Sequence, residues 1–566
     1  MLIIKKVTRT LVWVMVLSTS WMSLNAVAAL PIGSQLPGAQ QQRSIETERR
    51  NKQDERLLEK KKIPEKPTVD TQQVEPAKPE ISELTGPRFE LKAINFTDSD
   101  VFSDDELAAF TKDYIGRDVT FSELQRLVAD LNAEYYERGF ITAQAVIPAQ
   151  KLKSGILDVN LIEGHVGKIN LQGNEATKRS YIVDRIGQAP GDLFELQPLQ
   201  DSLLYFNKTN DVQLTSELQP GEKFGETDIS VEAYEPRTFV IELFGDNTGS
   251  SSTGEERGGI NVDHKSLFGY RDSLRISATA SRGSKEKSIS YSVPVNTQGG
   301  RLAFYYYDSE IDIIHGTLSN LNVGGGSTLR QYDFNQPLFV DEHWKIDGLI
   351  QVQDRHSFTD VDYEKIISSE ILNPSFGFNV EKEDESGIWF TSINFHRFRA
   401  KSGQHAYYSK TRLALARTQA LTDQFSGYFN FSGQYTNDNL LPSSEQFQIG
   451  GSASVRGYPE GQLIGDKGYY VNAEVISSLP MIQSESFATQ NSLQGFLFVD
   501  HGGVFSDIPT ETETQSDFLT SSGFGLRLAV SEHVTANAAV AWGINDHLDQ
   551  QEPRLHLRVS VYPVGR

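Results

Sequence analysis

The sequence has no cysteine, little apolar character for its length, and fewer positive than negative charges. Without cysteine the chain forms no disulfide and offers neither a thiolate nucleophile nor a cysteine-type zinc site. Its 566 residues include 53 Lys and Arg against 75 Asp and Glu, a balance of −22 that argues against a nucleic-acid binder. The hydrophobic content of 38% and mean hydropathy of −0.39 exclude a bundle of membrane helices. A membrane barrel stays compatible, because only alternate residues of its strands face lipid.

Residues 1–28 are predicted to be a signal peptide. Positive charges come first, an apolar stretch follows at residues 11–22, and the small residues 26–28 suit a cleavage site. An uncleaved membrane anchor is the alternative interpretation, but the apolar stretch is too short to span a bilayer.

Two segments of unusual composition follow. Residues 29–62 contain a highly charged stretch, 38–62, in which helix formers dominate and no proline occurs. This stretch predicts a solvated helix without a broad apolar face, and a disordered tether is the alternative. Residues 63–88 are rich in proline and predict an extended linker.

Residues 89–164 predict a compact α/β unit with the order β-α-α-β-β. Two capping boxes, Ser103 with Glu106 and Thr120 with Glu123, each open a helix. The flanking strands are expected at 89–96, 140–148 and 156–163.

Residues 165–236 repeat this order more loosely. A strand, two helices and two strands are expected at 166–171, 178–186, 196–207, 211–216 and 227–231. A generic small α/β domain without a transport role is the alternative interpretation of both units.

From residue 237 to residue 566 helix signals disappear, and apolar and polar residues alternate. About sixteen such segments of roughly ten residues fit into this range, which is typical of an outer-membrane barrel. Connections after odd-numbered strands are expected to be long and polar, as at 312–327, 355–371 and 436–467. A soluble sandwich would show the same alternation, but not the asymmetry between long and short connections.

The glycine-rich stretch 448–461 lies in one of the long connections and contains one cation, Arg456. Further along, Asp500 interrupts an apolar strand-like run in which Leu497 and Val499 take the opposite face. A carboxylate is very unfavourable in lipid, so Asp500 is expected to point into the lumen. We therefore predict that the loop folds into the barrel and that its arginine grips this carboxylate.

At these two places the chain resembles the transporters of two-partner secretion, the family of haemolysin activators and filamentous-haemagglutinin exporters. The family's marks are a Val-Arg-Gly-Tyr loop tip and a Phe-x-Asp-x-Gly strand that receives it. Here they are Val455, Arg456, Gly457 and Tyr458, and Phe498, Asp500 and Gly502. We expect the pair to brace the barrel and also to hold the conducting conformation, and a pair that only braces the barrel is the alternative.

The first α/β unit resembles a polypeptide-transport-associated (POTRA) domain. The resemblance rests on Tyr135–Gly139, Ile147–Gln150, Gly155 and Ile162–Gly164. With the second unit interpreted likewise, the expected fold is two periplasmic α/β POTRA domains followed by an all-β transmembrane barrel of about 16 antiparallel strands. In this family a helix in the place of 38–62 inserts into the pore as a removable plug.

The resemblance implies an outer-membrane translocator that exports one large unfolded exoprotein from the periplasm to the cell surface. The first POTRA domain would bind the N-terminal secretion domain of the partner along an open sheet edge. Residues expected to contribute are Tyr136, Gly139, Phe140, Pro148 and Gln150. Outer-membrane lipid and the barrel-assembly machinery are further expected partners, whereas no nucleic acid, cofactor or metal is expected.

No catalytic motif competes with this interpretation. The 11 histidines form no HExxH motif, and no Gly-x-Ser-x-Gly elbow accompanies the loop serines. The alternative function is a barrel-assembly insertase of the same superfamily, which shares the arginine loop. Two POTRA units and the plug-like start favour secretion, and a passive porin leaves the POTRA units unexplained.

Overall fold

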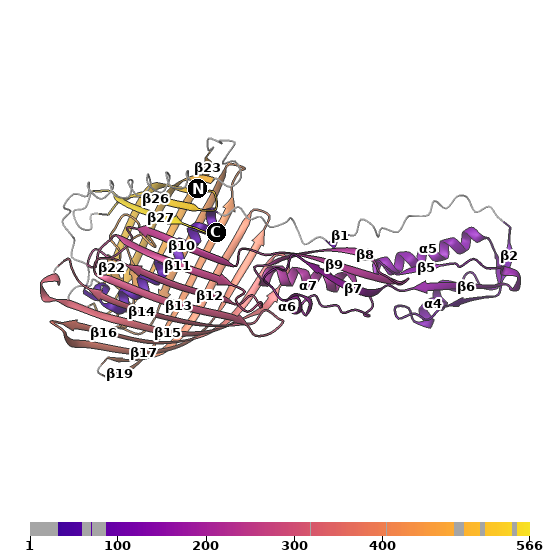
Figure 1. Cartoon of the computed structure of the whole chain (residues 1–566), viewed down its shortest axis with the longest axis horizontal. Helices are drawn as coiled ribbons and strands as arrows, with labels where there is room; N and C mark the ends of the chain where they lie inside the picture. Colours follow the sequence, from indigo (N-terminus) through magenta and orange to yellow (C-terminus); the bar gives the residue numbers. More distant parts are fainter. Residues whose placement is uncertain are drawn as a thin grey trace.

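The computed structural model describes residues 32–58, 69–70, 87–316, 318–402, 404–479, 492–509, 515–545 and 552–565. The molecule is elongated, with a barrel at one end and a narrow arm of two α/β units at the other (Figure 1). The predicted signal peptide and most of the predicted linker lie outside the described residues. Within the described ranges, no helix is both long and apolar enough to cross a bilayer.

The first unit of the arm has the predicted order. Its sheet runs β3-β6-β5, and both predicted capping boxes are present at the starts of α4 and α5. The apolar face of α5 is buried against this sheet. The elements are β2 (Phe89–Leu91), β3 (Ala93–Phe96), α4 (Asp104–Thr111), β4 (Arg117–Val119), α5 (Phe121–Glu137), β5 (Gln144–Val146), η2 (Leu152–Ser154) and β6 (Ile156–Ile162).

The strand predicted at 140–148 is shorter in the structure. Gly139 has a φ of +86°, and the amide of Ala143 then bonds to the carbonyl of Phe140 (3.0 Å), which makes a turn. The carbonyl of Gly139 accepts a hydrogen bond from the amide of Leu196 in the second unit (3.2 Å). Strand geometry therefore begins only at Gln144, and the preceding turn lies at the junction between the two units.

The second unit also follows the predicted order. Its sheet runs β1-β8-β9-β7, and β1 comes from the linker, where Val69 and Asp70 pair in parallel with Ser216 and Glu217. The elements are β1 (Val69–Asp70), β7 (His165–Gln172), α6 (Arg179–Val183), α7 (Leu196–Thr209), β8 (Gln213–Pro220) and β9 (Glu226–Tyr234).

Polar contacts join the second unit to the barrel. Arg271, in the turn that follows the second barrel strand, donates two hydrogen bonds to Asp211 (2.9 and 2.5 Å). Lys208 pairs with Glu383 (2.8 Å), which lies in a barrel strand next to another turn at the same end. These contacts fix the near end of the arm on the turns that close the barrel.

Sixteen strands among the described residues form a closed barrel in which neighbours are antiparallel. The closing seam between the first and last strand is short, with four residue pairs from Leu243↔Val561 to Asp246↔Arg558. The strands are β10 (Phe239–Asp246), β11 (Arg257–Lys265), β12 (Ser273–Ala280), β13 (Ser284–Pro294), β14 (Arg301–Asp312), β15 (Val323–Val340), β16 (Trp344–Val361), β17 (Glu364–Asp384), β18 (Gly387–Ser402), β19 (Gln404–Ala420), β20 (Phe425–Tyr435), β23 (Lys467–Leu479), β24 (Ser492–Phe505), β25 (Ser516–Val530), β26 (Val534–Gly543) and β27 (Arg554–Val561).

The prediction of a long polar connection at 355–371 is wrong. β16 continues to Val361 and β17 begins at Glu364, so a tight turn at Asp362 and Tyr363 replaces the expected loop. β15 to β19 are longer than the nine to eleven or so residues that a bilayer requires. The extra residues project from the end of the barrel that lies away from the arm. There both faces of a strand meet water, so polarity is compatible with strand pairing.

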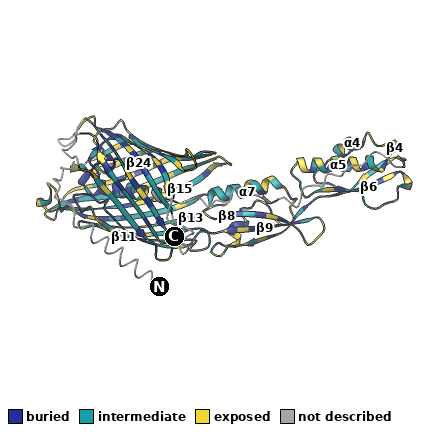
Figure 2. Ribbon diagram, turned by 90° about the horizontal axis from the view of Figure 1, so that it is seen from above, coloured by how far each residue is buried: buried dark blue, intermediate teal, exposed yellow. Residues whose placement is uncertain are grey.

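The alternation predicted around Asp500 is confirmed. The exposed fractions of Leu497 and Val499 are 66% and 52%, whereas Asp500 is fully buried on the opposite face of β24. Exposed and buried residues alternate in the same way along parts of β17 and β23, and Figure 2 shows both kinds of residue side by side on the barrel wall. The outward face suits lipid and the inward face carries the polar side chains.

Two helices, α2 (Ile32–Gln35) and α3 (Pro37–Leu58), lie inside the barrel (Figure 1). α3 corresponds to the helix predicted at 38–62, whose last residues, 59–62, lie outside the described ranges. Its buried side chains are largely polar and include Gln40, Gln41, Arg43, Thr47 and Arg50. A helix without an apolar face is therefore enclosed by a polar lumen.

Candidate functional site

The connection between β20 and β23 folds back into the barrel as an internal loop, residues 436–466. Its two limbs pair as a short hairpin of β21 (Phe447–Ile449) and β22 (Leu463–Gly465). Gly450, Gly451 and Gly461 take positive φ values of 104°, 96° and 69° around the tip. Glycine tolerates these conformations at no steric cost, so the chain can reverse within a narrow space.

Arg456 at the tip of the internal loop grips Asp500 on β24. Its Nε and Nη2 atoms donate to the two oxygens of the carboxylate at 2.8 and 2.7 Å, and its amide donates to Oδ2 at 3.1 Å. The arginine is 5% exposed and the aspartate is fully buried. The structure thus brings together the two residues that the sequence paired.

A second carboxylate, Glu474 on β23, shares this site. Its Oε1 atom accepts from Arg456 (2.8 Å) and from Arg50 of α3 (2.6 Å), and its Oε2 atom accepts from Arg527 on β25 (2.7 Å). We call these five residues, Arg50, Arg456, Glu474, Asp500 and Arg527, the arginine–carboxylate cluster. Buried charges of this kind are tolerated only when they are paired and hydrogen-bonded. The cluster therefore depends on α3, the internal loop and the barrel wall all being in place.

Aromatic rings line the cluster. The guanidinium of Arg456 lies 3.4 Å from the ring centroid of Phe498, and that of Arg527 lies 4.0 Å from the ring centroid of Phe496. Desolvated guanidinium groups gain from such stacking. Phe498 of the Phe-x-Asp-x-Gly motif, which we call the receptor motif, therefore supports the arginine directly.

The other residues of the tip motif pack against the barrel wall. Val455 and Tyr458 join an apolar cluster with Phe447, Ile449, Val504 and Leu519. A Cβ atom on Gly457 would lie 2.6 Å from the amide nitrogen of Gly543 and from the Cβ of Ser521, so only glycine fits. The Tyr458 hydroxyl accepts a hydrogen bond from the amide of Asn545 (3.1 Å).

Gly502 leaves room for the loop, but for its hairpin rather than its tip. A Cβ atom there would lie 3.1 Å from the Cβ of Tyr470 and 3.3 Å from the Cδ1 of Ile449 in β21. The receptor motif therefore accommodates two parts of the loop, since Asp500 holds the tip and Gly502 admits the limb.

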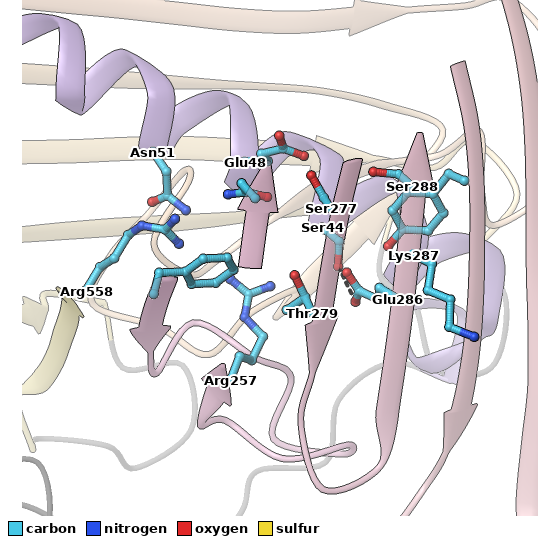
Figure 3. A pocket seen from close by; sticks show the side chains of 13 residues that line it. Ser44, Glu48, Asn51, Arg257, Ser277, Thr279, Glu286, Lys287, Ser288 and Arg558 are labelled. Atoms are coloured by element: carbon cyan, nitrogen blue, oxygen red, sulfur yellow. Dashed lines mark hydrogen bonds between the residues drawn. The ribbon is translucent and has the colours of Figure 1, made fainter. Parts of the chain in front are cut away.

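α3 contacts both the wall and the internal loop. Arg43 donates to the carbonyl of Glu460 (2.7 Å), and Gln448 donates to the carbonyl of Ala39 (3.2 Å). Ser44 donates to Glu286 on the wall (2.8 Å). Figure 3 shows this contact at the edge of a polar cavity of about 50 Å³ between α3 and the wall, lined by Glu48, Asn51, Arg257 and Arg558 among others.

In the first unit the expected open sheet edge is occupied at its centre. β5 is an edge strand, but the side chain of Asn132 on α5 bonds to both backbone groups of Ala145, at 2.6 Å to the amide and 3.3 Å to the carbonyl. Gln150 uses its amide in the same way on Asp158 of β6 (2.6 and 2.9 Å). Of the predicted partner-binding residues, Tyr136 is exposed.

The remaining predicted residues of this unit have structural contacts. Phe140 packs against the core of the first unit and Gly139 bonds to the second. The carbonyl of Pro148 accepts from Gln150 at 3.4 Å. Among the described side chains, no group of three His, Asp or Glu residues is arranged to hold a metal ion.

Sequence reasoning missed Glu474, Arg527 and Arg50. A signal for the first two was present: each is a charge between two apolar neighbours in an alternating strand, and the alternation turns both side chains inward. Nothing in the sequence distinguishes Arg50 from the other charges of α3, because its role depends on how far the helix enters the lumen.

Comparisons with known proteins agree with this geometry. Residues 225–528 match the family described as haemolysin secretion/activation protein ShlB/FhaC/HecB, and residues 89–164 match the ShlB-type POTRA domain. The heme/hemopexin transporter protein HuxB of Haemophilus influenzae is 23% identical over 83% of this chain and 86% of its own length. The outer membrane transporter CdiB of Dickeya dadantii is 23% identical over 82% of this chain and 84% of its own.

Solved structures share the fold. CdiB from Escherichia coli superposes with a TM-score of 0.65 at 18% identity, covering 95% of this chain and all of that one. BamA from Haemophilus ducreyi lacking POTRA domains 1–3 gives a TM-score of 0.52 at 15% identity over 84% of this chain. Because the family match spans more than half of the sequence, the chain belongs to the haemolysin secretion/activation protein family and is an outer-membrane transporter of two-partner secretion, with its POTRA region in the periplasm.

Proposed function

We propose that this transporter exports one large unfolded partner protein through its barrel after α3 has left the lumen. The observation that carries the proposal is that α3 fills the lumen and is held there by polar side chains of the wall and the internal loop. Each of these hydrogen bonds has a charged partner, and its net contribution is about 1.5–3 kcal/mol because the separated groups bond to water instead. A helix fixed in this way can leave, whereas a helix fixed by apolar packing would stay.

An engineered disulfide tests whether α3 must leave. A Cβ atom built on Gly38 of α3 lies 3.6 Å from the Cβ of Ser357 on β16, which is within the range for a disulfide. Since the chain has no cysteine, the variant Gly38→Cys/Ser357→Cys has one possible pair. We expect partner export to stop when the pair is oxidised and to resume after reduction.

The control for this experiment is Gly38→Cys alone. It introduces the same close approach to the Cβ of Ser444 (2.9 Å) but forms no bond to the wall. Full export through the oxidised double variant would contradict the proposal.

For recruitment, we propose that both units of the arm are POTRA domains and that the first binds the N-terminal secretion domain of the partner. The support is that β5 is an edge strand beside exposed Tyr136, and that its centre is covered only by the side chain of Asn132 among the described residues. An extended partner segment would displace this side chain and add to the sheet. Outer-membrane lipid would cover the outward side chains, such as Leu497 and Val499, after insertion by the barrel-assembly machinery.

A further inference from the structure

The internal loop is fixed at a second place, near its beginning, by Glu445. The Oε1 atom of its carboxylate accepts from Arg355 on β16 (3.2 Å), and Oε2 lies 2.7 Å from the Nζ of Lys410 on β19. Asn373 on β17 donates to Oε2 at 3.4 Å. All three charged side chains are at most 5% exposed. Three wall strands thus converge on one loop carboxylate.

The same wall residues also bind the backbone of the loop. Lys410 and Gln434 both donate to the carbonyl of Glu445 at 2.8 Å, and Arg355 donates to the carbonyl of Ser444 at 2.8 Å. If this limb of the loop moved away, two buried cations would lose a carboxylate and two carbonyls together. Unpaired buried charge is strongly unfavourable, so the limb is held firmly.

This contact lies at a different level of the barrel from the arginine–carboxylate cluster. Arg355 and Lys410 lie in the halves of β16 and β19 that are nearest to the outer hairpins, whereas Glu474 and Asp500 lie near the middle of β23 and β24. The loop is therefore attached close to the outer opening by Glu445 and halfway down the lumen by Arg456. The two attachments lie on opposite sides of the root of the loop between β20 and β23.

We propose that Glu445 is a positioning residue for export, which holds the first limb of the internal loop against β16–β19 and so keeps the outer opening clear. The proposal rests on the proposed passage of an unfolded chain through the lumen. If Glu445 is lost, the tip stays on Asp500 and Glu474 while the first limb swings into the exit path. Gln42 of α3 accepts from Arg355 at 3.1 Å, so the departure of α3 leaves this arginine to Glu445 and the neighbouring carbonyl.

Thiol labelling of the full-length chain in whole cells tests the proposal. Ser444→Cys and Ser454→Cys each place one thiol in a cysteine-free chain, at positions 3% and 4% exposed in the first limb and in the tip. With a membrane-impermeant maleimide, we expect Glu445→Ala to raise the labelling rate at position 444 roughly tenfold, because the limb then opens locally, and to leave position 454 protected. Glu445→Gln, which keeps the shape without the charge, should give an intermediate rate at 444.

The matched control is Asp507→Asn. It removes the carboxylate that pairs with Lys467 at the other end of the same loop (2.6 Å), where the aspartate is 54% exposed, and should change neither rate. Unchanged labelling at 444 in both Glu445 variants would overturn the proposal, and so would an equal rise at 444 and 454. Folding of each variant is checked by heat-shifted gel mobility. If Glu445→Ala does not assemble, the labelling rate of Glu445→Gln at position 444 decides the outcome. Labelling needs no partner protein, so this result is independent of the disulfide test of export.

Discussion

Arg50 of the lumenal helix and Arg456 of the loop tip donate to the same atom, Oε1 of Glu474, at 2.6 and 2.8 Å. The cluster around this atom holds three arginines and two carboxylates. Without α3 it would hold two of each and be electrically balanced. The helix therefore adds a surplus positive charge to the site that holds the loop, and its removal leaves the loop tip fully paired.

This charge balance predicts that Asp500→Ala is more harmful than Arg456→Ala. Loss of Asp500 leaves three arginines around one carboxylate, whereas loss of Arg456 leaves two arginines with two carboxylates. Breaking a buried pair costs on the order of 3–5 kcal/mol when the site is dry, and less where water enters. The measurement is the amount of partner in the medium, normalised to barrel that shows heat-shifted gel mobility.

The double variant Arg456→Ala/Asp500→Ala should do no worse than Asp500→Ala alone, because the interaction is already lost in the single variant. If the two single losses simply add, the residues do not act together and the coupling described here is wrong.

Removing α3 should open the pore. We expect deletion of residues 38–62 to raise the single-channel conductance in planar bilayers, and Arg50→Ala to raise the frequency of open events. Lys52→Ala is the control, because among the described residues Lys52 pairs within the helix, with Glu48 at 2.7 Å, and is 45% exposed. Unchanged conductance after the deletion would count against plugging.

Gly457→Ala should displace the loop tip. The added methyl group would lie 2.6 Å from two atoms of the wall, and overpacking of this kind costs roughly 1–3 kcal/mol. The control is Gly258→Ala, where the nearest atom is 3.9 Å away. The temperature of the heat-induced gel shift should fall for the first variant and stay unchanged for the second.

Deletion of residues 89–164 should abolish export while the barrel still reaches the outer membrane. Asn132→Ala should act in the opposite direction, because it uncovers the amide and carbonyl of Ala145 at the edge of β5. Binding of the partner's N-terminal region to the purified full-length transporter should strengthen about tenfold or less, the scale of one net hydrogen bond. Weaker binding by this variant would show that the partner docks elsewhere.

The first unit should show a pH-dependent contribution from Glu123. Its hydrogen bond from the amide of Thr120 (2.7 Å), helped by Arg117, lowers the pKa of this carboxyl from 4.5 to about 2. Stability that comes from the ionised group is therefore fully present above pH 4.5 and is lost as the pH falls through 2. Glu123→Gln should weaken hydrogen-exchange protection of α5 at pH 7, and its difference from wild type should shrink near pH 2.

The sequence predicted what depends on local pattern. Parity turned Asp500 inward, and the capping boxes at Ser103 and Thr120 located two helix starts correctly. The same alternation turns Glu474 and Arg527 inward, but it does not show which inward charges meet. A guanidinium has more donors than one carboxylate accepts, and its further partners depend on where the loop lies in the barrel.

Other features depend on contacts that no local pattern shows. The polar stretch 355–371 was predicted to be a loop because polarity normally marks a connection, yet strands that rise above the bilayer have no lipid-facing side. The contact of Asn132 with Ala145 depends on how α5 packs beside β5. The role of Glu445 depends on which strands meet the loop inside the closed barrel.

The pairing of β1 with β8 limits how far α3 can move from the second unit. Val69 and Asp70 are held on the second unit, and residues 59–68 connect them to the end of α3, a reach of at most about 40 Å. A helix that leaves the lumen while β1 stays paired remains close to the barrel opening. If α3 leaves as proposed, its return is a unimolecular step at an effective concentration on the millimolar scale, and we expect the pore to reseal without help once the exported chain has cleared it.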